Sequence, residues 1–142
     1  MPHPLMNVSL KTLLTLDAAT CALMGAGLVS ASQPLGAMLN IPAPLLFWAG
    51  LVLLPTAAFM AISAVATPTR WAMAVIVLGN ALWTLASLLA PAVGGFSPNP
   101  LGWVFLAGQA AAVAVLTKLE FDAMSCFTHE QVAAGRAGQR GA

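Results

Sequence analysis

Four long apolar stretches follow one another along the chain, and short segments rich in Pro, Gly, Asn and Ser separate them. The stretches cover approximately residues 9–29, 45–66, 71–90 and 101–119. Each has the length of about 20 residues that an α-helix needs to cross the hydrocarbon of a bilayer. The apolar runs are unbroken, whereas the strands of a membrane barrel alternate between lipid-facing and lumen-facing residues. The pattern therefore predicts an all-α integral membrane protein, a bundle of four transmembrane helices.

The segments between the apolar stretches predict loops, because their residues favour turns. The predicted loops are Ser30–Pro44, Thr67–Arg70 and Pro91–Pro100, with a short interfacial turn at Leu35–Leu39 inside the first. We expect residues 1–134 to form a single four-helix domain. Residues 135–142 are rich in Gly, Arg and Gln, so we expect them to form a disordered tail.

The scarcity of charge excludes several classes of protein. Of the 142 residues, 60% are hydrophobic and only 6% are charged, whereas about 25% are charged in soluble domains. Between Thr12 and Thr117 the only charged side chains are Asp17 and Arg70. This polar surface is too small to solvate a water-soluble globule, so we expect the lipid bilayer to be the surrounding medium. A net charge of +1 also provides no basic field that would hold a nucleic acid.

The chain contains no motif of a known catalytic or cofactor site. A Ser–His–Asp set, a G-x-S-x-G elbow, a phosphate-binding loop and an H-E-x-x-H pair are all missing from the sequence. Cys21 and Cys126 lie far apart and lack the spacing of metal ligands. We therefore predict that the protein is not an enzyme and holds neither a cofactor nor a metal.

The basic residues predict the orientation of the chain in the membrane. They lie near the amino terminus, in the second connection and near the carboxyl terminus, which four crossings place on one side. They are Lys11, Arg70, Lys118, Arg136 and Arg140. The other two connections carry no charge, so the positive-inside rule predicts that both termini are cytoplasmic.

The first apolar stretch has a second interpretation, a secretory signal peptide. Lys11 precedes it, and the small residues V-S-A-S before Gln33 are typical of a cleavage site. The presence of Asp17 within the stretch, and the length of the stretch, argue against cleavage. Cleavage would leave three membrane crossings instead of four.

Each predicted helix places a polar side chain at a similar depth in the membrane. At about 1.5 Å per residue, the depths from the cytoplasmic side are about 10 Å for Asp17, 13 Å for Asn80, and 15 Å for Thr56 and Gln109. Trp83 lies on the same helix face as Asn80. We expect these five residues to form an intramembrane polar cluster. Two interpretations stay open: hydrogen bonds that hold the helices together, or a site for transport or ligand binding.

Asp17 differs from the other members of this cluster because a carboxylate at that depth is costly. It must either bind a proton or find a cationic partner. The candidate partners are Arg70 and Lys118, which lie near the cytoplasmic ends of neighbouring predicted helices.

The chain resembles a group of short, four-span bacterial inner-membrane proteins whose function is uncharacterised. The resemblance lies in L-D-A (Leu16–Ala18), L-L-P (Leu53–Pro55), G-N-A-L-W (Gly79–Trp83), and a last span with Gln109 and the ending K-L-E (Lys118–Glu120). It implies a compact bundle in the bacterial inner (plasma) membrane and implies no activity. In its size and in the acid of its first span, the chain is also similar to small multidrug exporters, although its acid is Asp17 rather than Glu.

Two functional hypotheses follow. The first is a non-catalytic accessory or scaffold subunit, which contacts another membrane protein or a second copy of itself. It is favoured by the absence of catalytic motifs and by small residues that recur every four positions, such as Ala18, Ala22 and Ala26. The alternative is a small proton-coupled transporter or exporter that uses Asp17.

Overall fold

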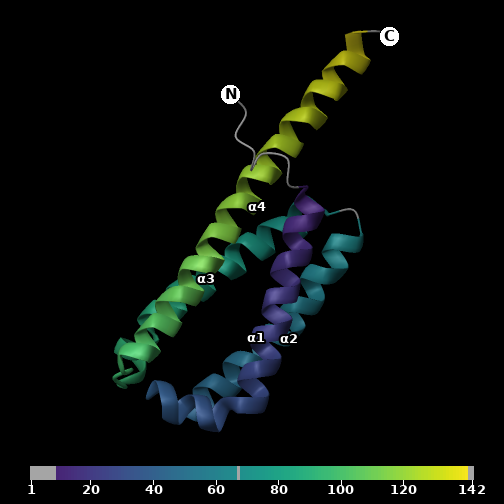
Figure 1. Cartoon of the computed structure of the whole chain (residues 1–142). Helices are drawn as coiled ribbons and strands as arrows, with labels where there is room; N and C mark the ends of the chain where they lie inside the picture. The colour runs from purple at the N-terminus through teal and green to yellow at the C-terminus, as the bar shows by residue number, and fades with distance from the viewer. Residues whose placement is uncertain (1–8, 67, 141–142) are drawn as a thin grey trace.

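The computed structural model describes residues 9–66 and 68–140. Four helices that alternate in direction make up most of this chain (Figure 1): α1 Leu10–Leu39, α2 Ala43–Val65, α3 Arg70–Gly94 and α4 Pro100–Arg140. Each contains a stretch long and apolar enough to cross a membrane, and the described residues include no strand. The prediction of an all-α, four-helix transmembrane fold is confirmed.

The ends of the helices follow from capping residues in the sequence. The Ser9 hydroxyl accepts a hydrogen bond from the N–H of Thr12, and the Thr69 hydroxyl accepts one from the N–H of Ala72, both at 3.2 Å. These side chains satisfy N–H groups that have no partner within the first turn of a helix. At the other end of α3, Gly95 adopts a φ of +64°, a left-handed conformation that ends the helix.

Helix α1 is longer than predicted and contains a bend. The bend lies at Ala31, where φ is −120° and ψ is 22°. Pro34 lies in the first turn of the part of α1 that follows the bend. The N–H groups of a first turn have no partner within the helix, so the missing N–H of proline removes no hydrogen bond there. The helix then continues to Leu39 and replaces most of the loop expected at Ser30–Pro44 and the turn expected at Leu35–Leu39.

Helices α3 and α4 also extend beyond the predicted spans. Helix α3 continues through Pro91 to Gly94, so the connection to α4 shortens to residues 95–99. Helix α4 continues to Arg140, through most of the tail that we expected to be disordered. Ala, Arg and Gln are good helix formers, and in this tail they outweigh glycines that each cost about 1 kcal/mol in a helix. Thr67, Gly141 and Ala142 lie outside the described residues.

The four helices form two hairpins. Helix α1 packs mainly on α2, and α3 packs on α4, while α1 also contacts α4. One end of the molecule, called the basic end below, is the end toward which Lys11, Arg70 and Lys118 lie (Figure 1). The connections at residues 40–42 and 95–99 lie at the opposite end, called the turn end below.

Hydrogen bonds join the two hairpins at the turn end. The Asn40 side-chain amide donates to the carbonyl of Ser97 at 2.7 Å. The Asn99 side-chain amide donates to the carbonyl of Met38 at 2.7 Å, and its backbone N–H donates to the carbonyl of Leu39 at 3.2 Å. The two connections therefore hold each other in place.

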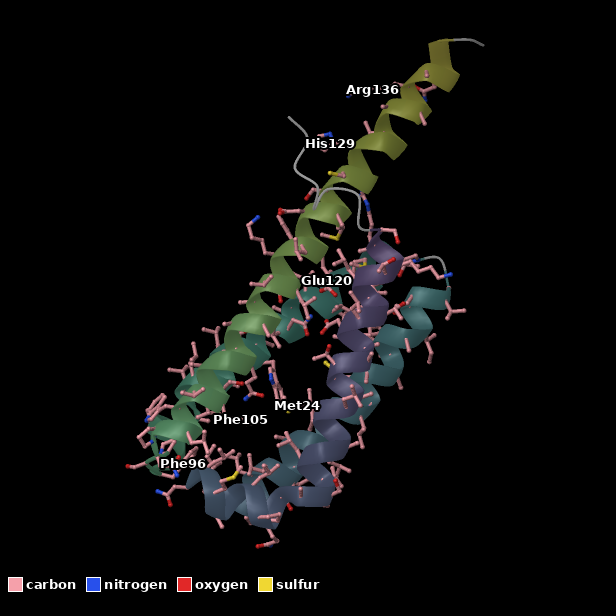
Figure 2. The ribbon with its side chains drawn as sticks, viewed as in Figure 1. Met24, Phe96, Phe105, Glu120, His129 and Arg136 are labelled. Atoms are coloured by element: carbon pink, nitrogen blue, oxygen red, sulfur yellow. The ribbon has the colours of Figure 1, made fainter. Side chains whose placement is uncertain are left out.

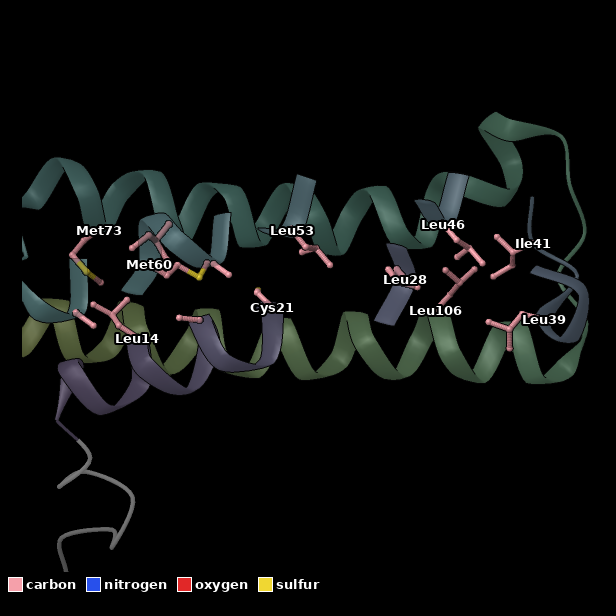
Figure 3. Close-up of a cluster of buried hydrophobic side chains, with 14 residues drawn as sticks. Leu14, Cys21, Leu28, Leu39, Ile41, Leu46, Leu53, Met60, Met73 and Leu106 are labelled. Carbon is pink, nitrogen blue, oxygen red and sulfur yellow. The ribbon is translucent and has the colours of Figure 1, made fainter. Parts of the chain in front are cut away.

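The apolar core is concentrated toward the two ends of the bundle (Figure 3). Leu14, Met60 and Met73 lie together toward the basic end, and Leu28, Leu39, Ile41, Leu46 and Leu106 lie together toward the turn end. The smaller side chain of Cys21 lies between these groups, together with Leu53. The middle of the bundle is therefore filled less completely than its ends.

The outer surface of the helices is apolar. Val65 and Val93 are 83% and 84% exposed, and Leu23 and Trp71 are exposed as well. A water-soluble domain of this size rarely exposes so continuous an apolar surface. The outer surface therefore contacts lipid, as the composition predicted.

The α1–α2 hairpin is closely packed because two glycines face each other. A β-carbon on Gly50 would lie 2.7 Å from the carbonyl oxygen of Gly25 and 2.8 Å from the β-carbon of Leu28. Real β-carbons essentially never approach other atoms this closely. A side chain at Gly50 must therefore push the two helices apart.

We predict that Gly50→Ala lowers the stability of the bundle, although alanine is the better helix former by about 1 kcal/mol. Overpacking at a closed contact costs about 1–3 kcal/mol, which exceeds that gain. The measurement is the free energy of unfolding of the purified protein in mixed detergent micelles. Gly27→Ala is the matched control, because a β-carbon there meets no atom within 4 Å. Equal stability of the two variants would contradict the close contact.

Candidate functional site

Two carboxyl groups and one amide meet inside the bundle. Asp17 of α1 and Glu120 of α4 are both 0% exposed, and Asn80 of α3 is 4% exposed. The side-chain nitrogen of Asn80 donates to Asp17 Oδ2 at 2.7 Å and to Glu120 Oε2 at 3.3 Å. The two acceptor oxygens therefore lie no more than about 6 Å apart, and three different helices contribute to one cluster.

The remaining oxygens of the two carboxyl groups differ in their surroundings. Asp17 Oδ1 accepts a weak hydrogen bond from the thiol of Cys21, with an Sγ···O distance of 3.7 Å. Glu120 Oε1 is buried and has no hydrogen-bond partner among the residues that the structure describes. A buried carboxylate oxygen without a partner is costly, whereas a protonated carboxyl group carries an O–H donor of its own and needs fewer donors around it.

The basic residues do not neutralise this cluster. Lys118 Nζ instead lies 2.7 Å from Asp122 Oδ2, four residues along α4, and both side chains are largely exposed. Arg70 is exposed at the start of α3. Among the described residues, the ion pair of Lys118 with Asp122 is the only one. Neither of the two candidate partners, Arg70 and Lys118, therefore pairs with Asp17 in the structure.

The sequence interpretation missed Glu120, because the fourth predicted span ended at residue 119. The structure places Glu120 on α4 at the side that faces α1 (Figure 2). A sign of this position was available in the sequence. Gln109 and Glu120 are eleven residues apart, which is close to three full turns of about 3.6 residues, so both lie on one helix face.

A cavity of about 380 Å³ adjoins the carboxyl cluster. All four helices line it, and its walls are mostly apolar side chains such as Met24, Leu53 and Leu116. All five residues of the predicted polar cluster are among its lining residues: Asp17, Thr56, Asn80, Trp83 and Gln109. The structure thus brings these residues to one cavity, although only Asp17 and Asn80 bond to each other.

The other three residues of the predicted cluster make separate contacts. The Gln109 amide donates to the hydroxyl of Ser87 at 3.3 Å, which joins α4 to α3. The Thr56 hydroxyl donates to the carbonyl of Val52 within its own helix at 2.8 Å. Trp83 is half-buried against the apolar core. These residues line the cavity without belonging to the carboxyl cluster.

A second cavity of about 290 Å³ adjoins the first toward the turn end. The two share four lining residues, among them Trp83 and Gln109, and the second reaches Leu28 and Ile41. Phe105 of α4 also lines it (Figure 2). The bundle therefore contains an apolar space that leads from the carboxyl cluster toward the turn end.

The electrostatics of the cluster favour a shared proton. Two like charges about 6 Å apart repel each other by about 3 kcal/mol at an effective dielectric constant of about 20. Hydrogen bonds between membrane helices contribute on average about 0.6 kcal/mol. Asn80 donates to both carboxyl groups, but its two bonds must offset the cost of burying two ionised carboxylates as well as their repulsion. A proton on the pair removes the repulsion and converts one carboxyl group into a donor.

No protein-family model, no curated protein and no solved structure matches this chain. The resemblance to four-span bacterial inner-membrane proteins therefore stays a prediction.

We predict that Asn80→Leu lowers the free energy of unfolding, because it leaves both carboxyl groups without their shared donor. An unsatisfied buried polar group costs about 1–3 kcal/mol. The measurement is the free energy of unfolding of the purified protein in mixed detergent micelles, with the loss of helix content as the signal. Thr84→Val is the control on the same helix, since the Thr84 hydroxyl bonds only to the carbonyl of Asn80 at 3.0 Å. The shared donor has no structural role if the two variants are equally stable.

Proposed function

We propose that this protein is a small proton-coupled transporter in which Asp17 and Glu120 hold the proton. The observation that carries this proposal is a buried carboxyl pair that has no cationic partner among the described residues and lies beside a cavity lined by all four membrane helices. Ionisable groups inside a membrane are costly and usually mark the pathway of a proton or a substrate. A purely structural link between helices could use neutral side chains, as Gln109 and Ser87 do.

The cavity indicates the chemistry of the transported solute. Its walls are apolar, and Trp83, Thr56 and Gln109 provide a few polar atoms. With one proton bound, the carboxyl pair retains one negative charge, which favours a solute that is apolar in most of its surface and cationic at one point. Entry of such a cation displaces this proton, and rebinding of one proton releases the cation.

The test uses the purified protein in liposomes with an acidic interior that contains a pH-sensitive dye. Tetraphenylphosphonium, followed by a panel of other small apolar cations, is added outside. The wild type should move protons out in response, and Asp17→Asn and Glu120→Gln should reduce this movement at least tenfold. Asp122→Asn is the matched control, because this exposed acid of α4 pairs with Lys118 outside the cluster. Proton movement in the two amide variants equal to that of the wild type would contradict the proposal.

A second candidate function is that of an accessory subunit of a membrane complex. The observation that favours it is the last part of α4, which extends away from the bundle and on which residues 132–139 are exposed throughout (Figure 1). His129 and Arg136 lie on this extension (Figure 2). If the wild type moves no protons with any cation of the panel, and a partner copurifies from native membranes in fixed ratio, this candidate replaces the transporter.

We also propose that the protein resides in a bacterial inner membrane with its basic end in the cytoplasm. Lys11, Arg70 and Lys118 all lie toward this end, and the two connections at the turn end carry no charge. Reporter fusions at the amino and carboxyl termini should both report the cytoplasm. Termini in opposite compartments would contradict the four-helix topology in the membrane.

A further inference from the structure

Hydrogen bonds connect the two hairpins on both sides of the cavity. At the turn end, Asn40 and Asn99 donate to backbone carbonyls of the opposite hairpin. Toward the basic end, Asn80 of the α3–α4 hairpin donates to Asp17 of the α1–α2 hairpin, and Glu120 lies beside this bond. The apolar space lies between these two connections.

The two connections respond differently to pH. The connection at the turn end consists of neutral amides and carbonyls, which do not titrate between about pH 5 and pH 9. The connection toward the basic end contains two carboxyl groups, and their charge depends on whether they hold a proton. Only this second connection can therefore be weakened by the loss of a proton.

Few other groups face the carboxyl pair from the surrounding helices. The thiol of Cys21 on α1 donates to Asp17, and α3 contributes the neutral amide of Asn80. Helix α2 contains no acidic, basic, His or Cys residue. On α4 the next acid, Asp122, is exposed and paired with Lys118. The charge at this connection is therefore set by Asp17 and Glu120.

Apolar contacts at the basic end do not compensate for repulsion there. Leu14 and Met60 of the first hairpin pack against Met73 of the second in the core (Figure 3). In a bilayer, lipid tails can replace such contacts, because lipid is as apolar as the side chains themselves. Polar interactions thus dominate the difference between a closed and an open basic end.

We propose that the proton shared by Asp17 and Glu120 is a latch that closes the cavity toward the basic end. When this shared proton leaves, both carboxyl groups are charged, so they repel each other and the two hairpins separate at this end. The contacts of Asn40 and Asn99 hold the turn end closed and serve as the hinge. The proposal deepens the proposed function and rests on it, since it describes how proton binding controls access to the same cavity.

The experiment measures distances between spin labels on the full-length protein in lipid nanodiscs. Cys126→Ser removes the exposed native thiol, and Cys21 stays because it is buried. Val65→Cys on α2 and His129→Cys on α4 report the basic end. Met38→Cys on α1 and Val104→Cys on α4 report the hinge. All four labelled positions are exposed.

On raising the pH from about 5 to about 9, the distance between positions 65 and 129 should increase by several ångströms, while the distance between positions 38 and 104 stays constant. Asp17→Asn and Glu120→Gln should each abolish the increase, because repulsion needs two charges. The two single variants provide independent tests, so loss of folding in one leaves the other informative. Asp122→Asn should behave as the wild type does.

The latch is contradicted if the distance between positions 65 and 129 does not change with pH in the wild type. It is also contradicted if this distance changes in both amide variants as much as it does in the wild type. These results are separable from the failure of the proposed function, because no solute is present in the distance measurement. A constant distance together with cation-driven proton movement in liposomes would overturn the latch alone. A distance that changes with pH, without such movement, would overturn the transporter and leave the latch in place.

Discussion

A carboxyl group inside hydrocarbon has no water to solvate it, and this constraint explains the arrangement at the centre of the molecule. The chain has only four acidic residues, and two of them, Asp17 and Glu120, are buried around the amide of Asn80. Lys118 and Asp122, the charged residues that flank Glu120 on α4, pair with each other at the surface. On the function proposed above, the buried pair lowers its charge by sharing a proton.

The rest of the bundle is arranged around this pair. The glycine contact between Gly25 and Gly50 holds the first hairpin together, and hydrogen bonds at the turn end fix it to the second. Apolar side chains fill both ends of the core, whereas the middle holds a cavity that adjoins the carboxyl pair. A buried carboxyl pair and an apolar cavity thus lie side by side in a protein of only 142 residues.

Much of this structure could be predicted from the sequence, because membrane crossing imposes a simple pattern. Unbroken apolar runs predicted four helices. The similar depths of Asp17 and Asn80 in the membrane predicted that these two residues belong to one polar cluster. The bend at Ala31 and the helix beyond it were not predicted, because Pro34 was interpreted as a loop residue although the first turn of a helix tolerates it. Helical residues 135–140 were likewise not predicted, since their glycines were given more weight than their alanines.

The main feature that was not predicted is the role of Glu120. Glu120 lies between the charged residues Lys118 and Asp122, and hydropathy ended the fourth predicted span at residue 119. The packing of α4 against α1 and α3 shows that Glu120 points into the bundle while Lys118 and Asp122 point outward. Charge composition therefore located the end of the apolar run but not the direction in which each charged side chain points.

The most direct test of the shared proton is infrared spectroscopy of the protein in lipid at neutral pH. A protonated carboxyl group has a carbonyl stretching band that is separate from the bands of ionised carboxylates. The wild type and Asp122→Asn should show this band at neutral pH, and the double variant Asp17→Asn with Glu120→Gln should lack it. If the wild type shows only ionised carboxylates at neutral pH, Asp17 and Glu120 do not share a proton and the proposed mechanism is wrong.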